Sequence, residues 1–215
     1  MKCVVVLLSL LSLGRSAPLS SCDSLLEPIT ISKEEMLGRW LYIGGSSDFP
    51  GSRSVGHLLT SAWLDLTATG QSNILNILQT QRMYGKCSSI TFNVTFENST
   101  MLIEQPFYLK EIYLTTDCSD CLVAYEEVLS GKDTFTSLLL FSKTKTVSSD
   151  VQERLRKQAE CLQMSSPIMI DPNYEMCPDG IPPSEGLGAL NTLLEAKMGH
   201  RVARVLDALF DLFVN

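Results

Sequence analysis

The sequence predicts an all-β fold with eight antiparallel strands in an up-and-down order, one packed α-helix and a C-terminal amphipathic helix. Short runs of alternating apolar and polar residues are separated by clusters of turn-forming residues. After residue 148 the apolar period changes from 2 to about 3.6, which is typical of helices. The 215 residues, 45% hydrophobic and 19% charged, suffice for one domain with a sizeable core.

Residues 1–16 are predicted to be a secretory signal peptide. Lys2 precedes an apolar run that is too short to span a bilayer, and small residues follow at Gly14, Ser16 and Ala17. We expect cleavage after Ser16 or Ala17. The mature chain would then lie outside the cell, where disulfides persist.

The chain is acidic, with 17 basic and 24 acidic side chains and a formal net charge of −7. Removal of the signal would make the charge −9, because two basic residues lie within residues 1–16. Such a balance argues against nucleic acid or anionic membranes as partners, since like charges repel at long range.

Eight runs in the body of the chain read as strands. The clearest is 90–97, where four apolar residues alternate with polar ones, as in a strand with one buried face. The connections between runs are short, and no strand–helix–strand unit is present, so we expect an antiparallel meander. The predicted strands are Trp40–Ser46, Val55–Leu66, Ile74–Met83, Ile90–Glu97, Met101–Glu104, Phe107–Thr115, Leu122–Leu129 and Phe135–Lys143.

Two helices are predicted after the strands. Apolar residues recur at helical spacing over Ser149–Met164, with Ser148, Ser149 and Asp150 available as N-cap groups. Residues 165–184 contain five prolines and read as an extended tail. Residues 185–215 again show a helical period, weakened near Gly199. This last helix is expected either to pack on the barrel or its mouth, or to dock on a lipid or lipoprotein surface.

Six cysteines remain after the signal, and three disulfides are the most economical interpretation among fifteen possible pairings. Cys118 and Cys121 could form a local disulfide, a redox pair or half of a zinc site. The disulfide is favoured because the following residues read as a strand, whereas a redox cysteine prefers a helix N-terminus. Zinc would need further ligands, and the chain offers only His57 and His200 as histidines.

Gly38-x-Trp40, preceded by a short helical segment and followed by a strand, resembles the lipocalin signature at the first barrel strand. The eight strands and the helix ending in Glu160-Cys161-Leu162 strengthen this resemblance, which covers Cys22 to Cys177. The branch with alpha-1-acid glycoprotein and apolipoprotein M is the most similar. Thr60–Trp63 resembles the second strand of fish tributyltin-binding and saxitoxin/tetrodotoxin-binding proteins.

The resemblance implies a lipocalin domain over 17–184 and bridges Cys22–Cys161 and Cys87–Cys177. The helical period adds an amphipathic extension over 185–215. Gly38 and Trp40 would form the barrel floor. The expected ligand-contacting residues are Tyr42 and Phe92, which strand alternation places inside such a barrel, and Gln81, Tyr125 and Phe141, which position in the resemblance adds. The arginine often found at the end of the last barrel strand is replaced by Lys143, which weakens analogies of receptor binding.

Two sequons, at Asn93 and Asn98, fit N-linked glycosylation of a secreted protein. Asn93 lies on the polar face of its predicted strand, and Asn98 lies in the following turn. A glycan at either position would project into solvent.

The function expected from the resemblance is a secreted, monomeric carrier in plasma or another body fluid, binding a small hydrophobic or amphipathic xenobiotic, toxin, drug or steroid. The alternative is a surface-acting protein in acute-phase or immune modulation, or on lipoproteins. Neither histidine lies in the context of a general base, and no nucleophile elbow, phosphate-binding loop or paired-metal motif is present. We therefore expect no catalysis, metal or cofactor.

Overall fold

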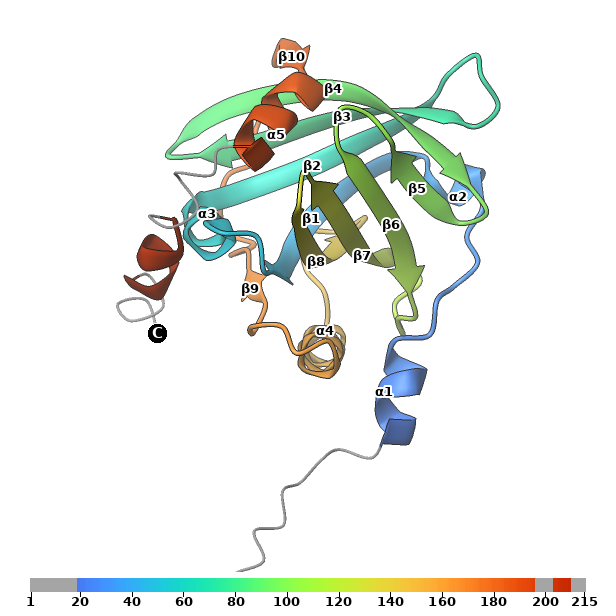
Figure 1. The fold of residues 1–215 in the computed structure, drawn as a ribbon, viewed down its shortest axis with the longest axis vertical. Coiled ribbons are helices and arrows are strands. Elements are labelled where there is room, and N and C mark those ends of the chain that lie inside the picture. The colour runs from blue at the N-terminus through green and yellow to red at the C-terminus, as the bar shows by residue number, and fades with distance from the viewer. Residues whose placement is uncertain (1–18, 196–202, 210–215) are drawn as a thin grey trace, which may run out of the picture.

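The computed structural model describes residues 19–195 and 203–209, and its centre is a closed barrel of eight antiparallel strands (Figure 1). The predicted fold class is confirmed. The elements in chain order are α1 (Leu19–Leu25), α2 (Lys33–Met36), β1 (Gly38–Ser47), α3 (Ser52–Leu58), β2 (Leu59–Ala68), β3 (Ile74–Met83), β4 (Lys86–Glu97), β5 (Thr100–Ile103), β6 (Tyr108–Leu114), β7 (Cys121–Ser130), β8 (Asp133–Ser142), α4 (Ser149–Cys161), β9 (Ile168–Met169), β10 (Pro183–Glu185) and α5 (Gly186–Glu195).

Each barrel strand pairs with the next one in sequence, and β8 returns to pair with β1. Trp40 on β1 lies opposite Leu64 on β2, and Tyr42 lies opposite Phe141 on β8. The turn between β4 and β5 has positive φ at Asn98 and Ser99, as tight hairpins require. These local signals produce the predicted meander.

The predicted strand Val55–Leu66 is wrong in its first half, because residues 52–58 form α3 and β2 begins at Leu59. His57 therefore lies in a helix. The N-terminus of α3 receives its capping groups from a distant segment: Asp207 accepts from the Gly51 and Ser54 amides, both at 2.8 Å. A contact across more than 150 residues overrides the local strand pattern.

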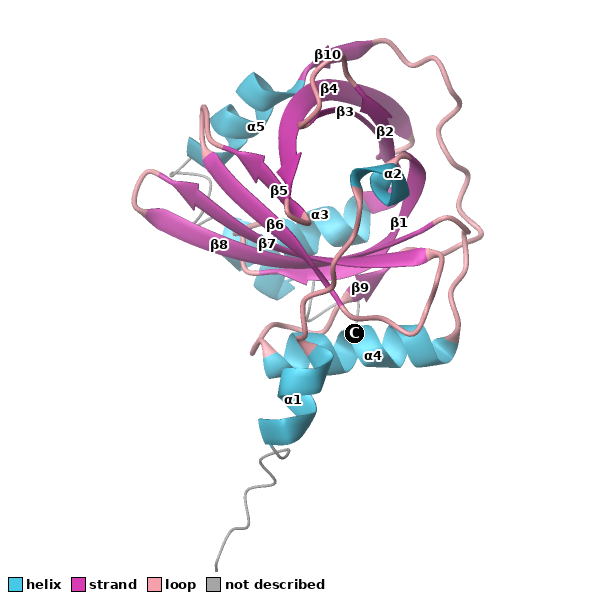
Figure 2. Cartoon of the chain, turned by 90° about the vertical axis from the view of Figure 1, so that its right-hand side faces the viewer, coloured by secondary structure: helices cyan, strands magenta, loops and turns pink. Residues whose placement is uncertain are grey.

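The barrel wall separates two apolar clusters. The inner cluster lies on the inside of the barrel wall and includes Trp40, Phe96 and Phe135. The outer cluster lies between the wall and α4, whose Val151 and Leu155 are buried. Of the three N-cap candidates Ser148 caps this helix, which ends at Cys161, three residues before the predicted end, and packs on the outside of the sheet (Figure 2).

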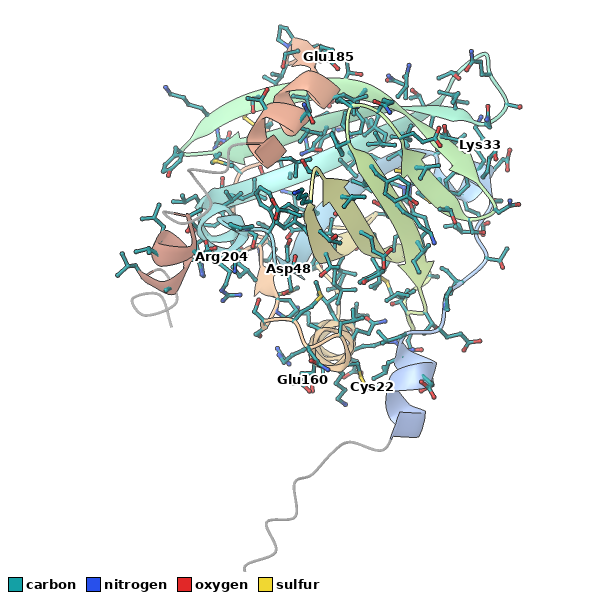
Figure 3. All side chains as sticks on the ribbon, viewed as in Figure 1. Cys22, Lys33, Asp48, Glu160, Glu185 and Arg204 are labelled. Carbon is teal, nitrogen blue, oxygen red and sulfur yellow. A yellow bond between two sulfur atoms is a disulfide. The ribbon has the colours of Figure 1, made fainter. Side chains whose placement is uncertain are left out.

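Three disulfides tie the periphery to the barrel. Cys22–Cys161 and Cys87–Cys177 are the pairs that the resemblance implies, and Cys118–Cys121 is the local disulfide that its spacing favours. The first links α1 to the end of α4, where Figure 3 shows Cys22 and Glu160 close together. The second links β4 to the proline-rich tail.

The tail runs back along the barrel and adds two short strands. β9 pairs with β1 at Gly44 and Gly45, where a Cβ at Gly44 would lie 2.5 Å from the Ile168 carbonyl oxygen. Only glycine permits this close approach. β10 pairs in parallel with β4 over Ser89–Thr91 and leads directly into α5.

The predicted signal peptide and Gly199 lie outside the described residues. Within residues 185–215, helix is present at α5 and again over residues 203–209.

Candidate functional site

The barrel encloses a cavity of about 440 Å³. Apolar side chains form most of its wall, as is usual for a small-molecule site. One end is closed by α2, which lies across the barrel in Figure 2. There Trp40 Nε1 donates a hydrogen bond to the Met36 carbonyl oxygen at 2.9 Å, and Lys143 Nζ lies 3.6 Å from the Trp40 ring centre. Lys143 also donates to the Leu37 carbonyl oxygen at 3.1 Å.

Four of the five expected ligand-contacting residues line the cavity: Tyr42, Gln81, Phe92 and Phe141. Trp40 also lines it, at the closed end. The Tyr42 and Phe141 rings are 5.8 Å apart and tilted against each other, which fixes one side of the wall. Gln81 accepts a hydrogen bond from Gln79, a second amide in the lining, at 3.3 Å.

The expectation that Tyr125 contacts the ligand is wrong, because Tyr125 does not line the cavity. On β7 the inward positions are those of Ala124, Glu126 and Val128, so the intervening Tyr125 faces outward. Its ring packs against the outer cluster, and its hydroxyl lies 3.4 Å from Glu127 Oε1. The position inferred from the resemblance was wrong by one residue, which places the side chain on the opposite face of the strand.

A row of polar residues crosses the mostly apolar inner wall from β6 to β1. Glu111 on β6 lies directly opposite Glu126 on β7. Glu126 in turn lies opposite Ser137 on β8, and Ser137 lies opposite Ser47 on β1. All four line the cavity. The Ser137 hydroxyl donates to the Ser47 hydroxyl at 3.0 Å, which leaves the two carboxyl groups as the chargeable part of the row.

Burial raises the pKa of both carboxyl groups. The pKa of Glu126 rises well above its usual value, first through burial and then through the adjacent Glu111 charge. Burial likewise raises the pKa of Glu111. The pair therefore favours a state that carries at least one proton.

Two tyrosine hydroxyl groups face the same pair. Burial and the Glu111 and Glu126 charges raise the pKa of Tyr113, and burial with the Glu126 charge raises that of Tyr42. Both phenols stay protonated at neutral pH. Tyr113 is 1% exposed, and a hydrogen bond between its hydroxyl and the Glu111 carboxyl group contributes to the raised pKa of the phenol.

Sequence reasoning missed the polar row, although a signal for it was present. On the predicted strand Phe107–Thr115, Glu111 shares its face with Leu109 and Tyr113. A charged residue on the apolar face of a strand is unusual and marks a candidate site. Only the register shows that Glu111 faces Glu126.

The C-terminal helix α5 also lines the cavity, through Leu190 and Leu194. Its position follows from the short β5, which pairs with β4 at 95–97. Farther along the same edge of β4, β10 pairs at 89–91 and α5 packs against β4 and β7. Figure 1 shows α5 beside β4. α5 thus completes the barrel wall.

The described residues include no group of three or more His, Cys, Asp or Glu side chains placed to hold a metal ion. Within the same residues, no helix has the length and apolar character needed to cross a membrane.

No family model and no curated protein matches the sequence. Among solved structures, 245 chains match the fold. One is the siderocalin Ex-FABP, described as functioning through dual ligand specificities. It matches with a TM-score of 0.58 at 14% identity, over 70% of this chain and 99% of the other. With the closed eight-stranded barrel, its floor and the helix packed outside the wall, this likeness shows that the chain has the lipocalin fold.

Proposed function

We propose that this protein is an extracellular carrier that binds one small hydrophobic or amphipathic molecule inside its barrel. The observation that carries the proposal is the cavity of about 440 Å³, whose wall is mostly apolar with a few inward polar groups. Burial of an apolar ligand surface there supplies affinity, and the polar groups orient the ligand. The resemblance to carriers of xenobiotics, toxins, drugs and steroids agrees with this chemistry.

Secretion and glycosylation belong to the same proposal. Asn93 and Asn98 are exposed, so a glycan at either would meet no buried surface. The three disulfides suit an oxidising compartment.

The direct test is native mass spectrometry of the protein purified from a secreting cell culture, followed by extraction and identification of any bound small molecule. We expect one apolar or amphipathic molecule per barrel, and ligand addition to quench the fluorescence of Trp40, which lines the cavity. An empty barrel that responds to no steroid, lipid, organotin or alkaloid would overturn the proposal.

A matched pair of variants assigns the binding to the barrel. Ala62→Trp places a large side chain at the cavity wall, whereas Thr67→Trp adds the same side chain at an exposed position of β2. We expect the first variant to lose the ligand and the second to retain it. Equal retention by both would place the ligand elsewhere.

A second candidate function is association with a lipid or lipoprotein surface. It is favoured by Val205, Leu206 and Leu209, which are 60%, 43% and 43% exposed on the segment 203–209. Flotation with phosphatidylcholine vesicles tests it, with Leu206→Ser/Leu209→Ser as the variant that should fail to float.

A further inference from the structure

One stretch of the cavity wall is a helix placed at the edge of a strand. β5 pairs with β4 only over residues 95–97, and β10 takes the same edge over Ser89–Thr91. α5 follows β10 directly, and its Leu190 and Leu194 line the cavity. Around the rest of the barrel, the wall consists of strands that are hydrogen-bonded to their neighbours. The cavity is therefore bounded by two kinds of wall.

The contacts that hold α5 to the barrel are mostly apolar. In the described part of the chain, the side-chain hydrogen bonds of α5 are local. Glu185 accepts from the Leu187 and Gly188 amides at 2.9 and 3.0 Å, and Thr192 donates to the Gly188 carbonyl oxygen at 2.9 Å. The link to the barrel consists of the three-residue ladder of β10 and three leucines that are only partly buried. Elements with few buried contacts open at a lower free-energy cost than core strands.

α3, at the end of the barrel opposite α2, is held much more firmly (Figure 2). It also lines the cavity. The Asp207 carboxylate accepts from the Gly51 amide, the Ser54 amide and the Ser54 hydroxyl, at 2.8, 2.8 and 2.7 Å. Arg53 donates to a hydroxyl and a carbonyl oxygen of the tail, at 3.2 and 3.0 Å. Because hydrogen bonds to charged groups are stronger than neutral ones, α3 is harder to displace than α5.

α5 lies between two anchors in the chain. Before it, Cys177 is disulfide-bonded to β4, and Asp179 binds Arg39 at 2.7 Å. After it, segment 203–209 binds α3. Gly180 follows the first anchor; it is exposed, has a φ of +81°, and a Cβ there would have no atom within 4 Å. Backbone rotation at such a residue meets no obstacle, so the part after it can move while both anchors hold.

We propose that β10 and α5, residues 183–195, form a lateral gate through which the ligand enters and leaves the cavity while α3 stays in place. This inference rests on the proposed carrier function and specifies the route to its site. α5 packs against β4 and β7. Its displacement would remove Leu190 and Leu194 from the wall and open the cavity between these strands.

The test cross-links the lateral gate to β4. A Cβ at Gly186 would lie 3.1 Å from the Ile90 Cβ, so Ile90→Cys/Gly186→Cys needs only a small shift to reach disulfide geometry. Ile90→Ser/Gly186→Ser is the matched control, because serine has nearly the same shape and forms no cross-link. Peptide mass spectrometry establishes that the new disulfide has formed beside the three native ones.

The probe is N-phenyl-1-naphthylamine, a neutral apolar molecule whose fluorescence rises in apolar surroundings. Its displacement by 1-adamantanol, and the loss of its signal in Ala62→Trp, assign the signal to the cavity. Stopped-flow mixing then gives the rates of binding and release.

A gate controls both rates and leaves the equilibrium unchanged. The cross-linked variant should bind and release the probe at least about tenfold more slowly than the serine control, because opening must precede entry. Its Kd should stay within about twofold of the control, since the closed protein is the same in both. Equal rates in the two variants would overturn the inference.

The end of the barrel at α3 is the competing route. Asp207→Ala in the cross-linked background releases α3 while the gate stays shut. We expect entry to remain slow. Recovery of fast entry in this variant would show that the ligand passes α3, which would overturn the inference.

Hydrogen exchange of the native protein gives a readout that needs no cross-link. The amides of α5 should exchange at least about tenfold faster than those of α3, because the gate opens without unfolding of the barrel. Exchange in α5 as slow as in α3, or slower, would contradict a gate at this position.

The outcomes separate this inference from the carrier function. Binding of the probe at rates that the cross-link does not change would leave a carrier and remove only the lateral gate. Failure of N-phenyl-1-naphthylamine and 1-adamantanol to bind, together with an empty barrel in mass spectrometry, would remove both.

Discussion

The two helices that follow the barrel strands, α4 and α5, bury their apolar faces on opposite sides of the wall. α4 packs Val151, Leu155 and Ala159 against the outer face of the sheet. α5 packs Leu187, Leu190 and Leu194 against the inner cluster, and the last two line the cavity. Both helices are amphipathic, so the pattern of apolar residues does not reveal which side a helix covers.

The difference follows from the edges of the barrel. Next to α4 the strands β7 and β8 are paired along their full length, so a helix there can cover only the outer face. Next to α5, the short β5 leaves part of the β4 edge to β10 and the helix. A helix that covers the outside contributes stability, whereas one that completes the wall also shapes the ligand site.

The largest expected effect is on stability, from Leu155→Ala in α4. Leu155 is 1% exposed, and the loss of a buried leucine side chain costs about 2–5 kcal/mol. Urea unfolding should show this loss of stability. The folded variant should bind 1-adamantanol with the affinity of the native protein. Lys157→Ala, at an exposed position of the same helix, should change stability by less than about 0.5 kcal/mol. A loss of ligand affinity in Leu155→Ala would contradict the conclusion that α4 contributes only to stability.

The second effect is on binding, from Leu190→Ser/Leu194→Ser in α5. Polar side chains at these positions remove apolar wall, and we expect about tenfold weaker binding of 1-adamantanol, or about 1.4 kcal/mol. Leu206→Ser/Leu209→Ser changes exposed leucines of the C-terminal segment and serves as the control. Native affinity in the α5 variant would show that α5 covers the barrel without shaping the site.

The third effect concerns the contact between segment 203–209 and α3. Asp207→Ala removes the carboxylate that accepts from the Gly51 and Ser54 amides and from the Ser54 hydroxyl. A lost helix cap of this kind costs about 1 kcal/mol. Hydrogen exchange should quicken in α3 and stay unchanged in α4, whose Ser148 cap is separate. Uniform acceleration would indicate that Asp207 supports the whole fold.

The smallest expected effect is on stability, from the replacement of Glu126 on the inner face of the wall. The pKa of Glu126 is higher in the native state than in the unfolded chain. Protonated Glu126 therefore contributes fully to the stability of the native state below about pH 4, and this contribution is lost as the pH rises through the raised pKa. Glu126→Gln should therefore stabilise the protein at neutral pH by about 1 kcal/mol. The difference should shrink toward pH 4 in thermal unfolding. Destabilisation at neutral pH would show that the charged form is favoured.

Much of the fold could be predicted because its signals are local. Alternation marked the strands, the capping residues of 148–150 marked the start of α4, and Gly38-x-Trp40 marked the first strand and the barrel floor. The same alternation placed Tyr42 and Phe92 inward, where they line the cavity. Tyr125 failed because the position inferred from the resemblance was off by one residue, and one residue reverses the face of a strand.

The sequence by itself determined the strand order, a helix beginning at residue 149 and the apolar character of the inner wall, because period and turn residues encode them locally. Only the tertiary structure decided that residues 52–58 form a helix capped by Asp207, that α5 completes the wall, and that Glu111 faces Glu126. Each of these depends on the register or docking of segments far apart in the chain. Such contacts form, and stabilise the protein, only after the barrel has closed.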